Sequence, residues 1–260
     1  MNKRNSQTGI FNRRLLLNAE FSTSDISIPE KIVSIISSLP EKQQLEIYAY
    51  VREVHKKSFE LPVIKPVNEI PNKIIPFSEA MNKNNRDFDC WVCFYEDDSK
   101  FEVIRNDPMR HISHLQKFRG IISPDFSIQS GSARSTQLLN TYCGRVFASY
   151  LQRMGILVIP NIRYAGKVSR DFCCEGISSN SVVAVGALGC LNRHHYIERR
   201  EIFFEGLDFI VELLTPKAVI VYGSSSISDF RKYVNQGVDI RLYPPFTRLV
   251  KEKFSKFRCV

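Results

Sequence analysis

The feature that most constrains the fold is an alternation of short apolar runs with amphipathic segments, which begins near residue 87. The runs are mostly β-branched and uninterrupted, as in strands that are buried on both faces of a sheet. Gly155 and Gly237 follow two of the amphipathic segments, at the position of a helix C-cap. The predicted strands cover residues 90–95, 120–123, 156–159, 182–185, 218–222 and 238–242, and the predicted helices cover residues 108–118, 135–154, 198–214 and 228–235.

Strand–helix–strand repetition of this kind predicts an α/β fold with a parallel, mostly buried sheet and right-handed crossover helices. The pattern does not distinguish an open doubly wound sheet from a partial barrel. In either case the carboxyl ends of the strands meet at one edge of the sheet, where ligands of parallel α/β folds collect.

Upstream of this domain the sequence divides into three shorter segments. Residues 1–27 are basic and lack a sustained period, which predicts a mobile arm. Residues 28–57 predict two helices, each with a proline at its first position, that need the main domain or a protein partner to pack against. Residues 58–79 carry four regularly spaced prolines and predict an extended linker or a strap across the surface. The α/β domain then covers residues 80–260 and includes a basic C-terminal tail.

The net charge of +9 is concentrated at the two ends of the chain. Residues 1–20 carry +3 and residues 241–260 carry +5, so residues 21–240 carry only +1. A basic end suits contact with a polyanion such as nucleic acid, but a solvated terminus has the same composition. Residues 246–257 have apolar residues at helical spacing, so we expect one face to dock on the domain. The side chains that would remain for phosphate are Lys251, Lys253, Lys256 and Arg258.

The cysteines and the hydropathy point to a cytoplasmic protein without a membrane span. Seven cysteines is an odd number, which does not favour a secreted disulfide framework, and no apolar stretch approaches the roughly 20 residues of a transmembrane helix. Cys90 and Cys93 have the spacing of a zinc or redox motif. They lie in a predicted strand, however, where residues three apart point to opposite faces, so we predict no metal site there. The phosphate-binding motifs of dinucleotide and P-loop proteins are absent from the sequence, which argues against NAD or ATP bound through those motifs and leaves the cofactor unknown.

Polar and small residues follow the predicted strands, and they are the candidates for a binding or catalytic pocket. Asp125, Asn161 and Asp171 are candidate catalytic residues, the two carboxylates as general bases or metal ligands and the amide as an orienting group. Asp, Asn and Gly also cap loops and helices, which is the competing interpretation of each residue alone. The candidates for binding the ligand, which we expect to be a nucleotide or nucleic acid, are Arg163, Arg145, Asn140, Ser127, Gly186 and Gly223. The alternative is a non-enzymatic interaction protein that uses its N-terminal helices for a partner and its basic ends for nucleic acid.

Residues from about 90 to 242 resemble a bacterial and bacteriophage domain family of unknown function. The resemblance implies a prokaryotic, often mobile-element setting, and it implies no reaction. Tyr164 stands where such proteins usually carry Trp. The resemblance rests on Gly120-Ile-Ile-Ser-Pro-Asp-Phe-Ser127, Asn140-Thr-Tyr142 with Arg145, Gly155-Ile-Leu-Val-Ile-Pro-Asn-Ile-Arg163, Asp171-Phe-Cys173, Gly176-Ile177, Ser181-Val-Val-Ala-Val-Gly186 and Val221-Tyr-Gly223.

Overall fold

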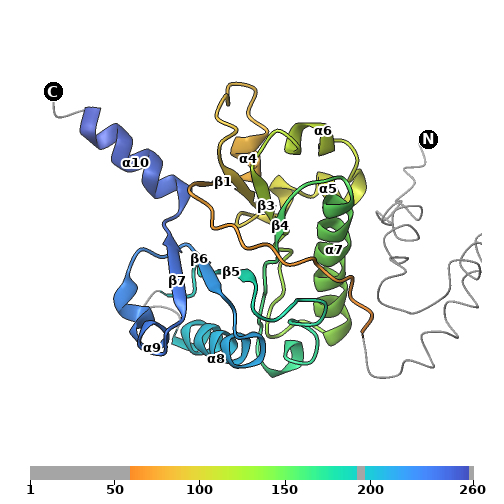
Figure 1. Cartoon of the computed structure of the whole chain (residues 1–260), viewed down its shortest axis with the longest axis vertical. Helices are drawn as coiled ribbons and strands as arrows, with labels where there is room; N and C mark the ends of the chain where they lie inside the picture. Colours follow the sequence, from red (N-terminus) through yellow and green to blue (C-terminus); the bar gives the residue numbers. More distant parts are fainter. Residues whose placement is uncertain (1–58, 192–196, 258–260) are drawn as a thin grey trace, which may run out of the picture.

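The computed structural model describes residues 59–191 and 197–257 of the chain, with side chains as far as residue 251. Within this part the predicted α/β architecture is confirmed, because strands alternate with helices and the strand pairings are parallel (Figure 1). The arm, the two N-terminal helices and Arg258 lie outside the described residues. The elements are β1 Ile74–Pro76, α4 Phe77–Ala80, β2 Trp91–Cys93, η1 Asp98–Lys100, α5 Val103–Asn106, α6 Ile112–Leu115, β3 Gly120–Ile122, α7 Arg134–Arg153, β4 Val158–Ile159, η2 Lys167–Ser169, β5 Val182–Gly186, α8 Ile197–Leu214, β6 Ala218–Tyr222, η3 Ile227–Phe230, α9 Arg231–Asn235, β7 Asp239–Tyr243 and α10 Phe246–Phe257.

The strands form two parallel sheets, one with the order β1-β2-β3-β4 and one with the order β5-β6-β7. A single bridge between Asn161 and Ala184 joins them. At this bridge the Ile162 N–H donates to the Ala184 carbonyl (2.8 Å) and the Ala184 N–H donates to the Pro160 carbonyl (2.9 Å). The strands therefore follow one another side by side in chain order.

The unbroken strand order decides between the two predicted arrangements. A doubly wound sheet reverses its strand order at a switch point, and no such reversal occurs among the described strands. One face of the strands forms an interior cluster to which all seven contribute and no helix does, while α7 and α8 pack on the other face. This is an open, barrel-like arrangement, since β1 and β7 are not paired with each other in the part of the chain that is described. The cluster contains Val67, Ile74, Trp91, Cys93, Tyr95, Ile122, Ile159, Val182, Ala184, Ala218, Ile220, Tyr222 and, partly buried, Tyr243.

The segment predicted as an extended linker or a strap across the surface is extended and packs on the domain. Residues 59–73 cross the amino ends of β5 and β6, where the Val182 N–H donates to the Val67 carbonyl (3.2 Å) and Lys217 donates to Asn68 (3.0 Å) (Figure 1, orange). The segment then forms β1, which the sequence did not predict. Prolines exclude a helix but not an edge strand, and Pro76 lies in a strand that pairs only with β2. The domain therefore begins before residue 80.

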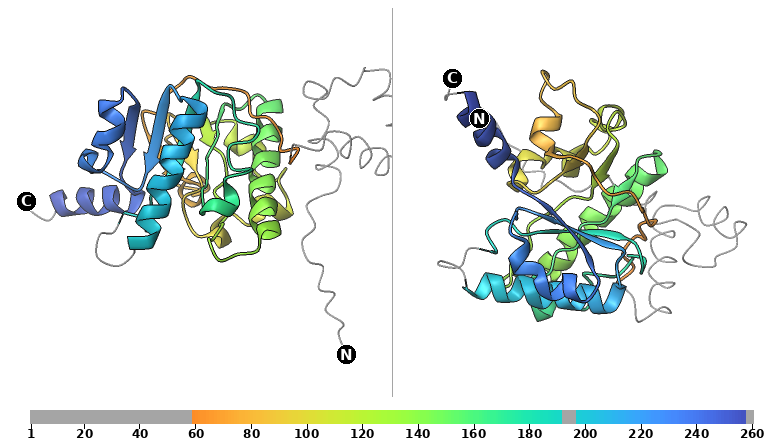
Figure 2. Two further views of the ribbon diagram at one scale, coloured as in Figure 1. Left: turned by 90° about the horizontal axis from the view of Figure 1, so that it is seen from below. Right: turned by 60° about the vertical axis from the view of Figure 1, so that its left-hand side comes forward.

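The C-terminal helix α10 covers the residues in which the sequence has helical spacing. Figures 1 and 2 show it projecting from the body rather than lying along it. At its start Phe246 packs against the hydrophobic cluster that includes α7, and the Phe246 N–H donates to the Tyr222 hydroxyl (3.1 Å). Leu249 and Val250 are half-buried. Docking of one face of residues 246–257 stays a prediction beyond residue 251, where the side chains are not described.

One expectation from the apolar patterning agrees with the described residues. Cys90 belongs to the hydrophobic cluster that includes α7, and Cys93 belongs to the interior cluster. The two cysteines therefore lie on opposite faces of the strand. Burial raises the pKa of Cys90 to about 11 and that of Cys93 to about 12. Among the helices that the structure describes, none combines the length and the apolar character that a membrane crossing needs.

Gly120 provides a test of the interior packing. It pairs with Trp91, and a Cβ at residue 120 would stand 2.5 Å from the buried indole ring. We expect Gly120→Ala to lower the free energy of unfolding by about 1–3 kcal/mol, the usual cost of overpacking a core. Gly131→Ala is the matched control, because a Cβ there meets nothing within 4 Å, and it should change the free energy by less than about 0.5 kcal/mol. Urea denaturation measures both, and equal effects would contradict the packing argument.

Candidate functional site

Asp125, Asn161 and Arg163 come together at the carboxyl ends of β3 and β4. Asp125 is buried, and one of its carboxylate oxygens accepts from the Asn161 side-chain amide (2.8 Å). The other oxygen accepts from the Arg163 guanidinium at 2.5 Å. The juxtaposition that the strand ends predicted is therefore present in the structure, and its polar groups are joined in one network.

Asn161 lies at the centre of this network. Its backbone N–H donates to the Ser123 hydroxyl (2.8 Å) and its side-chain oxygen accepts from the Tyr95 hydroxyl (2.9 Å). Because the oxygen faces Tyr95, the amide nitrogen faces Asp125. The orientation of the amide is thus determined by partners on both of its sides.

Arg145 reaches the same region from α7 but contacts backbone instead of Asp125. It is buried, and its two terminal nitrogens donate to the carbonyls of Asn161 (3.1 Å) and Cys173 (2.8 Å). Burial lowers the pKa of Arg145 to about 10. A buried guanidinium whose donors engage two carbonyls holds the loop after β4 in place, and the predicted role in anion binding has no direct contact to support it.

Asn140 and Ser127 organise the loop after β3. The Ser127 N–H and hydroxyl both donate to Asp98 (3.1 and 2.9 Å), and the Asn140 amide donates to the Ser127 carbonyl (2.6 Å). Arg105 in turn donates to the Asn140 oxygen (3.1 Å). These contacts shape the loop, and neither Asn140 nor Ser127 lines the large pocket described below.

Asp171 lies apart from the other candidates, which corrects the prediction of a second carboxylate in the cluster. It follows η2 in the connection between β4 and β5, and 59% of its side chain is exposed. Its carboxylate accepts from Arg134 at 2.9 Å. The connection turns outward after η2, so closeness in sequence to the strand ends did not bring the side chain to them.

The two candidate glycines allow neighbouring residues to pack close to the backbone. A Cβ at Gly186 would stand 2.9 Å from the Tyr95 ring, so this glycine leaves room for the ring beside β5. Gly223 has φ +100, and a Cβ there would meet the Leu188 backbone at 2.8 Å. Gly186 also lines the large pocket, whereas Gly223 does not.

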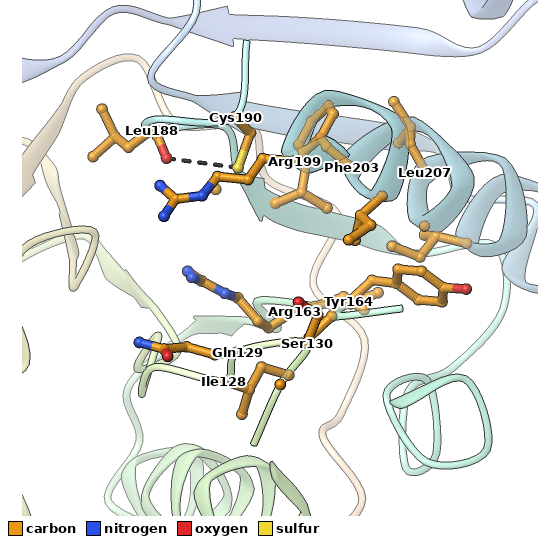
Figure 3. Close-up of a pocket in the computed structure, with 18 residues that line it drawn as sticks. Ile128, Gln129, Ser130, Arg163, Tyr164, Leu188, Cys190, Arg199, Phe203 and Leu207 are labelled. Carbon is orange, nitrogen blue, oxygen red and sulfur yellow. Dashed lines mark hydrogen bonds between the residues drawn. The ribbon is translucent and has the colours of Figure 1, made fainter. Parts of the chain in front are cut away.

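A cavity of about 360 Å³ lies beside this network, between the loops after β3, β4 and β5 and the helix α8. Figure 3 shows that Gln129, Arg163 and Arg199 extend toward one end of it, with the two guanidinium groups on opposite walls. Tyr164, Phe203 and Leu207 lie toward the other end. The remaining lining residues are Ile128, Ser130, Gly131, Ile162, Ala165, Val185, Gly186, Leu188, Cys190, Ile202, Gly206 and Ile210.

The charge of this cavity is positive. None of the described residues that line it is acidic. Asp125 does not line the cavity, but it forms an ion pair with Arg163, which does. The Asp125 carboxylate raises the pKa of Arg163, so the guanidinium remains charged at any physiological pH. Arg199 adds a second charge in the first turn of α8, where the helix dipole has the same sign.

Sequence reasoning missed Arg199 and Gln129. Arg199 lies in a predicted helix, and its spacing from Arg163 contains no motif, so only the packing of α8 across the strand ends brings the two together. Tyr164 was noted only as an aromatic substitution. Its ring fits against α8 because residue 206 is glycine, where a Cβ would stand 2.5 Å from Tyr164. No cluster of three or more potential metal-ligating side chains lies among residues 59–191 and 197–257.

Comparison with known proteins gives a family but no activity. A family model described as a domain of unknown function (DUF4417) matches residues 53–244, which include the polar network and the whole pocket and exclude α10. The Gene 1 protein of Mycobacterium phage L5 is 28% identical over 170 residues, which cover 64% of this chain and 72% of the relative. The Gene 1 protein of Mycobacterium phage D29 is 25% identical over 167 residues, covering 64% and 61%. No solved structure matches the chain.

Two carboxylates predicted as equivalent candidates provide a test of the network. Asp125→Asn removes the charge that Arg163 and Asn161 contact, and we expect the free energy of unfolding to fall by about 1.5–3 kcal/mol, the range for hydrogen bonds to charged groups. Asp171→Asn removes one side of an exposed ion pair and should cost less than about 1 kcal/mol. Urea denaturation of both variants measures the difference. A cost for Asp171→Asn equal to that for Asp125→Asn would contradict the assignment of Asp125 as the buried centre of the network.

Proposed function

The chain belongs to the DUF4417 family of domains of unknown function, and we propose that the pocket beside Arg163 binds a nucleotide. The observation that carries the proposal is the pair of guanidinium groups, Arg163 and Arg199, on opposite walls at one end of a cavity whose other end is apolar and aromatic (Figure 3). A nucleotide has the same two-part character, with an anionic phosphate at one end and a flat, largely apolar base at the other.

The phosphate end is supported by the way Arg163 is held. Its ion pair with the buried Asp125 fixes one terminal nitrogen, and 37% of the side chain stays exposed toward the pocket. A guanidinium whose direction is set before the ligand arrives loses less conformational entropy on binding. Planar donors also match the oxygens of a phosphate group better than an ammonium does.

The base end is supported by size and by its lining. A cavity of about 360 Å³ falls within the range of about 300–1,000 Å³ that is usual for small-molecule sites. Tyr164 and Phe203 provide aromatic surface, and Leu207 and Ile210 provide aliphatic surface from α8. The Tyr164 hydroxyl donates to Glu205 (2.9 Å), which holds the ring at the pocket wall.

Within this proposal Asp125 has an orienting role and not that of a general base. Its two oxygens accept hydrogen bonds from Asn161 and Arg163, and the buried side chain does not line the pocket, so no contact supports the role of a general base. The proposal is therefore one of binding, and no reaction is assigned to the pocket.

Calorimetric titration with adenosine 5′-monophosphate and with the other common mononucleotides tests this function. We expect Arg163→Gln and Arg199→Gln each to weaken binding by roughly 10- to 100-fold, because a hydrogen bond to a charged group is worth about 1.5–3 kcal/mol. Lys83→Gln is the control, since it removes one positive charge from an exposed position outside the pocket lining. Absence of binding to every nucleotide, or equal affinities for the three variants, would contradict the proposal.

Cys190 offers a second readout of the same pocket. It lines the pocket, and it is the one cysteine among the described residues that is not buried. In a Cys259→Ser background, a bound nucleotide should slow the alkylation of Cys190. An alkylation rate that saturating nucleotide leaves unchanged would place the ligand elsewhere.

A second candidate function is supported by α10, which extends away from the body and lies beyond the part matched by the family model (Figure 2). It is basic, its first half carries Arg248 and Lys251, and Lys251 is exposed. Further along, the sequence adds Lys253, Lys256 and Arg258. A basic projecting helix suits non-specific contact with the phosphates of a nucleic acid.

Changing Lys251, Lys253 and Lys256 together to Ala tests this second function. Filter binding should show weaker affinity for unrelated DNA sequences to about the same degree, because phosphate contacts do not read bases. The slope of log affinity against log salt should flatten by up to roughly 0.7–0.9 for each lysine–phosphate interaction that the change removes. No affinity of the unaltered protein for nucleic acid near 0.1 M salt would leave α10 as a solvated helix only.

A further inference from the structure

Tyr95 lies two residues beyond β2, belongs to the interior cluster and is only 5% exposed. We propose that Tyr95 is a positioning residue, which sets the direction of Arg163 through Asn161 and Asp125 and thereby the preference of the pocket for an anionic ligand. This inference rests on the proposed nucleotide site. Tyr95 itself does not line the pocket, so it acts without touching the ligand.

The first step is the direction of the Asn161 amide. Its oxygen accepts from the Tyr95 hydroxyl (2.9 Å) while its nitrogen donates to Asp125 (2.8 Å). Burial, and next the Asp125 charge, raise the pKa of Tyr95 well above its usual range, so the hydroxyl keeps its proton and donates. Removal of this donor leaves the amide oxygen without its Tyr95 hydrogen bond, so only the hydrogen bond to Asp125 still orients the side-chain amide. An amide held at one end alone has more freedom to turn, and the carboxylate it contacts is held less firmly.

The second step leads from Asp125 to Arg163. The carboxylate is oriented by the amide on one oxygen and holds the guanidinium on the other. When the amide hydrogen bond weakens, the carboxylate is free to turn about its own bonds, and the guanidinium turns with it. The direction of Arg163 in the pocket therefore depends on a hydroxyl that belongs to a different strand.

The third step is the fixation of the Tyr95 ring. It stacks on Tyr222 with the ring centroids 5.0 Å apart and an interplanar angle of 17°. Gly186 leaves the space that the ring occupies beside β5. The ring is thus held by residues of β5 and β6, and removal of the hydroxyl alone leaves its packing unchanged.

Tyr95→Phe is the test. We expect the affinity for adenosine 5′-monophosphate to fall by roughly 5-fold, because a side chain that is no longer held in one direction costs about 0.5–1.5 kcal/mol to immobilise on binding, while the affinity for uncharged adenosine stays the same. Tyr233→Phe is the matched control: it also removes a buried tyrosine hydroxyl, one that faces the Phe204 carbonyl (3.4 Å) and not Asn161. It should leave both affinities unchanged. Equal losses for nucleotide and nucleoside, or nucleotide binding by Tyr95→Phe that matches the unaltered protein, would overturn the inference.

A measurement on the ligand-free protein separates this inference from the proposed function. The side-chain N–H signal of Arg163, assigned by its loss in Arg163→Gln, should broaden or shift in Tyr95→Phe and stay in place in Tyr233→Phe. If the unaltered protein binds no nucleotide but Tyr95→Phe mobilises Arg163, the positioning role stands and the proposed ligand is wrong. If the Arg163 signal is the same in both variants, the positioning role is wrong whatever the protein binds.

Discussion

The joint at Asn161 is the interaction on which the rest of the structure depends. Its backbone pairs with Ala184 and so connects the first sheet to the second, while its side chain connects Tyr95 to Asp125. Arg145 donates to its carbonyl from α7. One residue therefore links the alignment of the two sheets to the geometry of the polar network, and displacement of either one would be transmitted to the other.

The pocket forms where the same joint lacks a long connecting helix. The connection between β4 and β5 contains only the short η2, whereas α7 and α8 are the long helices that flank it. The helical layer is thus incomplete where the two sheets meet. Loops after β3, β4 and β5 form the walls of the space that remains, and α8 closes one side of it. A site at the carboxyl ends of parallel strands is common in α/β proteins, and in this protein the missing helix provides its volume.

The balance of charge around this joint supports the proposal that the pocket binds an anion. Arg145, Arg163 and Asp125 lie close to the joint, and their formal charges leave an excess of one positive charge. Carbonyl groups satisfy two of the Arg145 donors, and Asp125 compensates Arg163. Arg199 enters from α8 and adds a further positive charge to the pocket. An anionic ligand in the pocket would lie beside the Arg163 and Arg199 side chains.

The sequence by itself determined the local elements and the polar character of the strand ends. β-branched runs and helical spacing located β2 to β7 and the long helices, because these patterns reflect burial of one residue against its close neighbours. Placement of Asp125, Asn161 and Arg163 directly after strands was enough to bring them together, since parallel strands end at a common edge. Only the tertiary structure decided which way each loop turned beyond that edge. Asp171 turned outward to Arg134, Arg199 turned in from α8, and a proline-rich segment became the edge strand β1. These outcomes depend on packing between segments far apart in the chain, and no periodicity within a single segment encodes such packing.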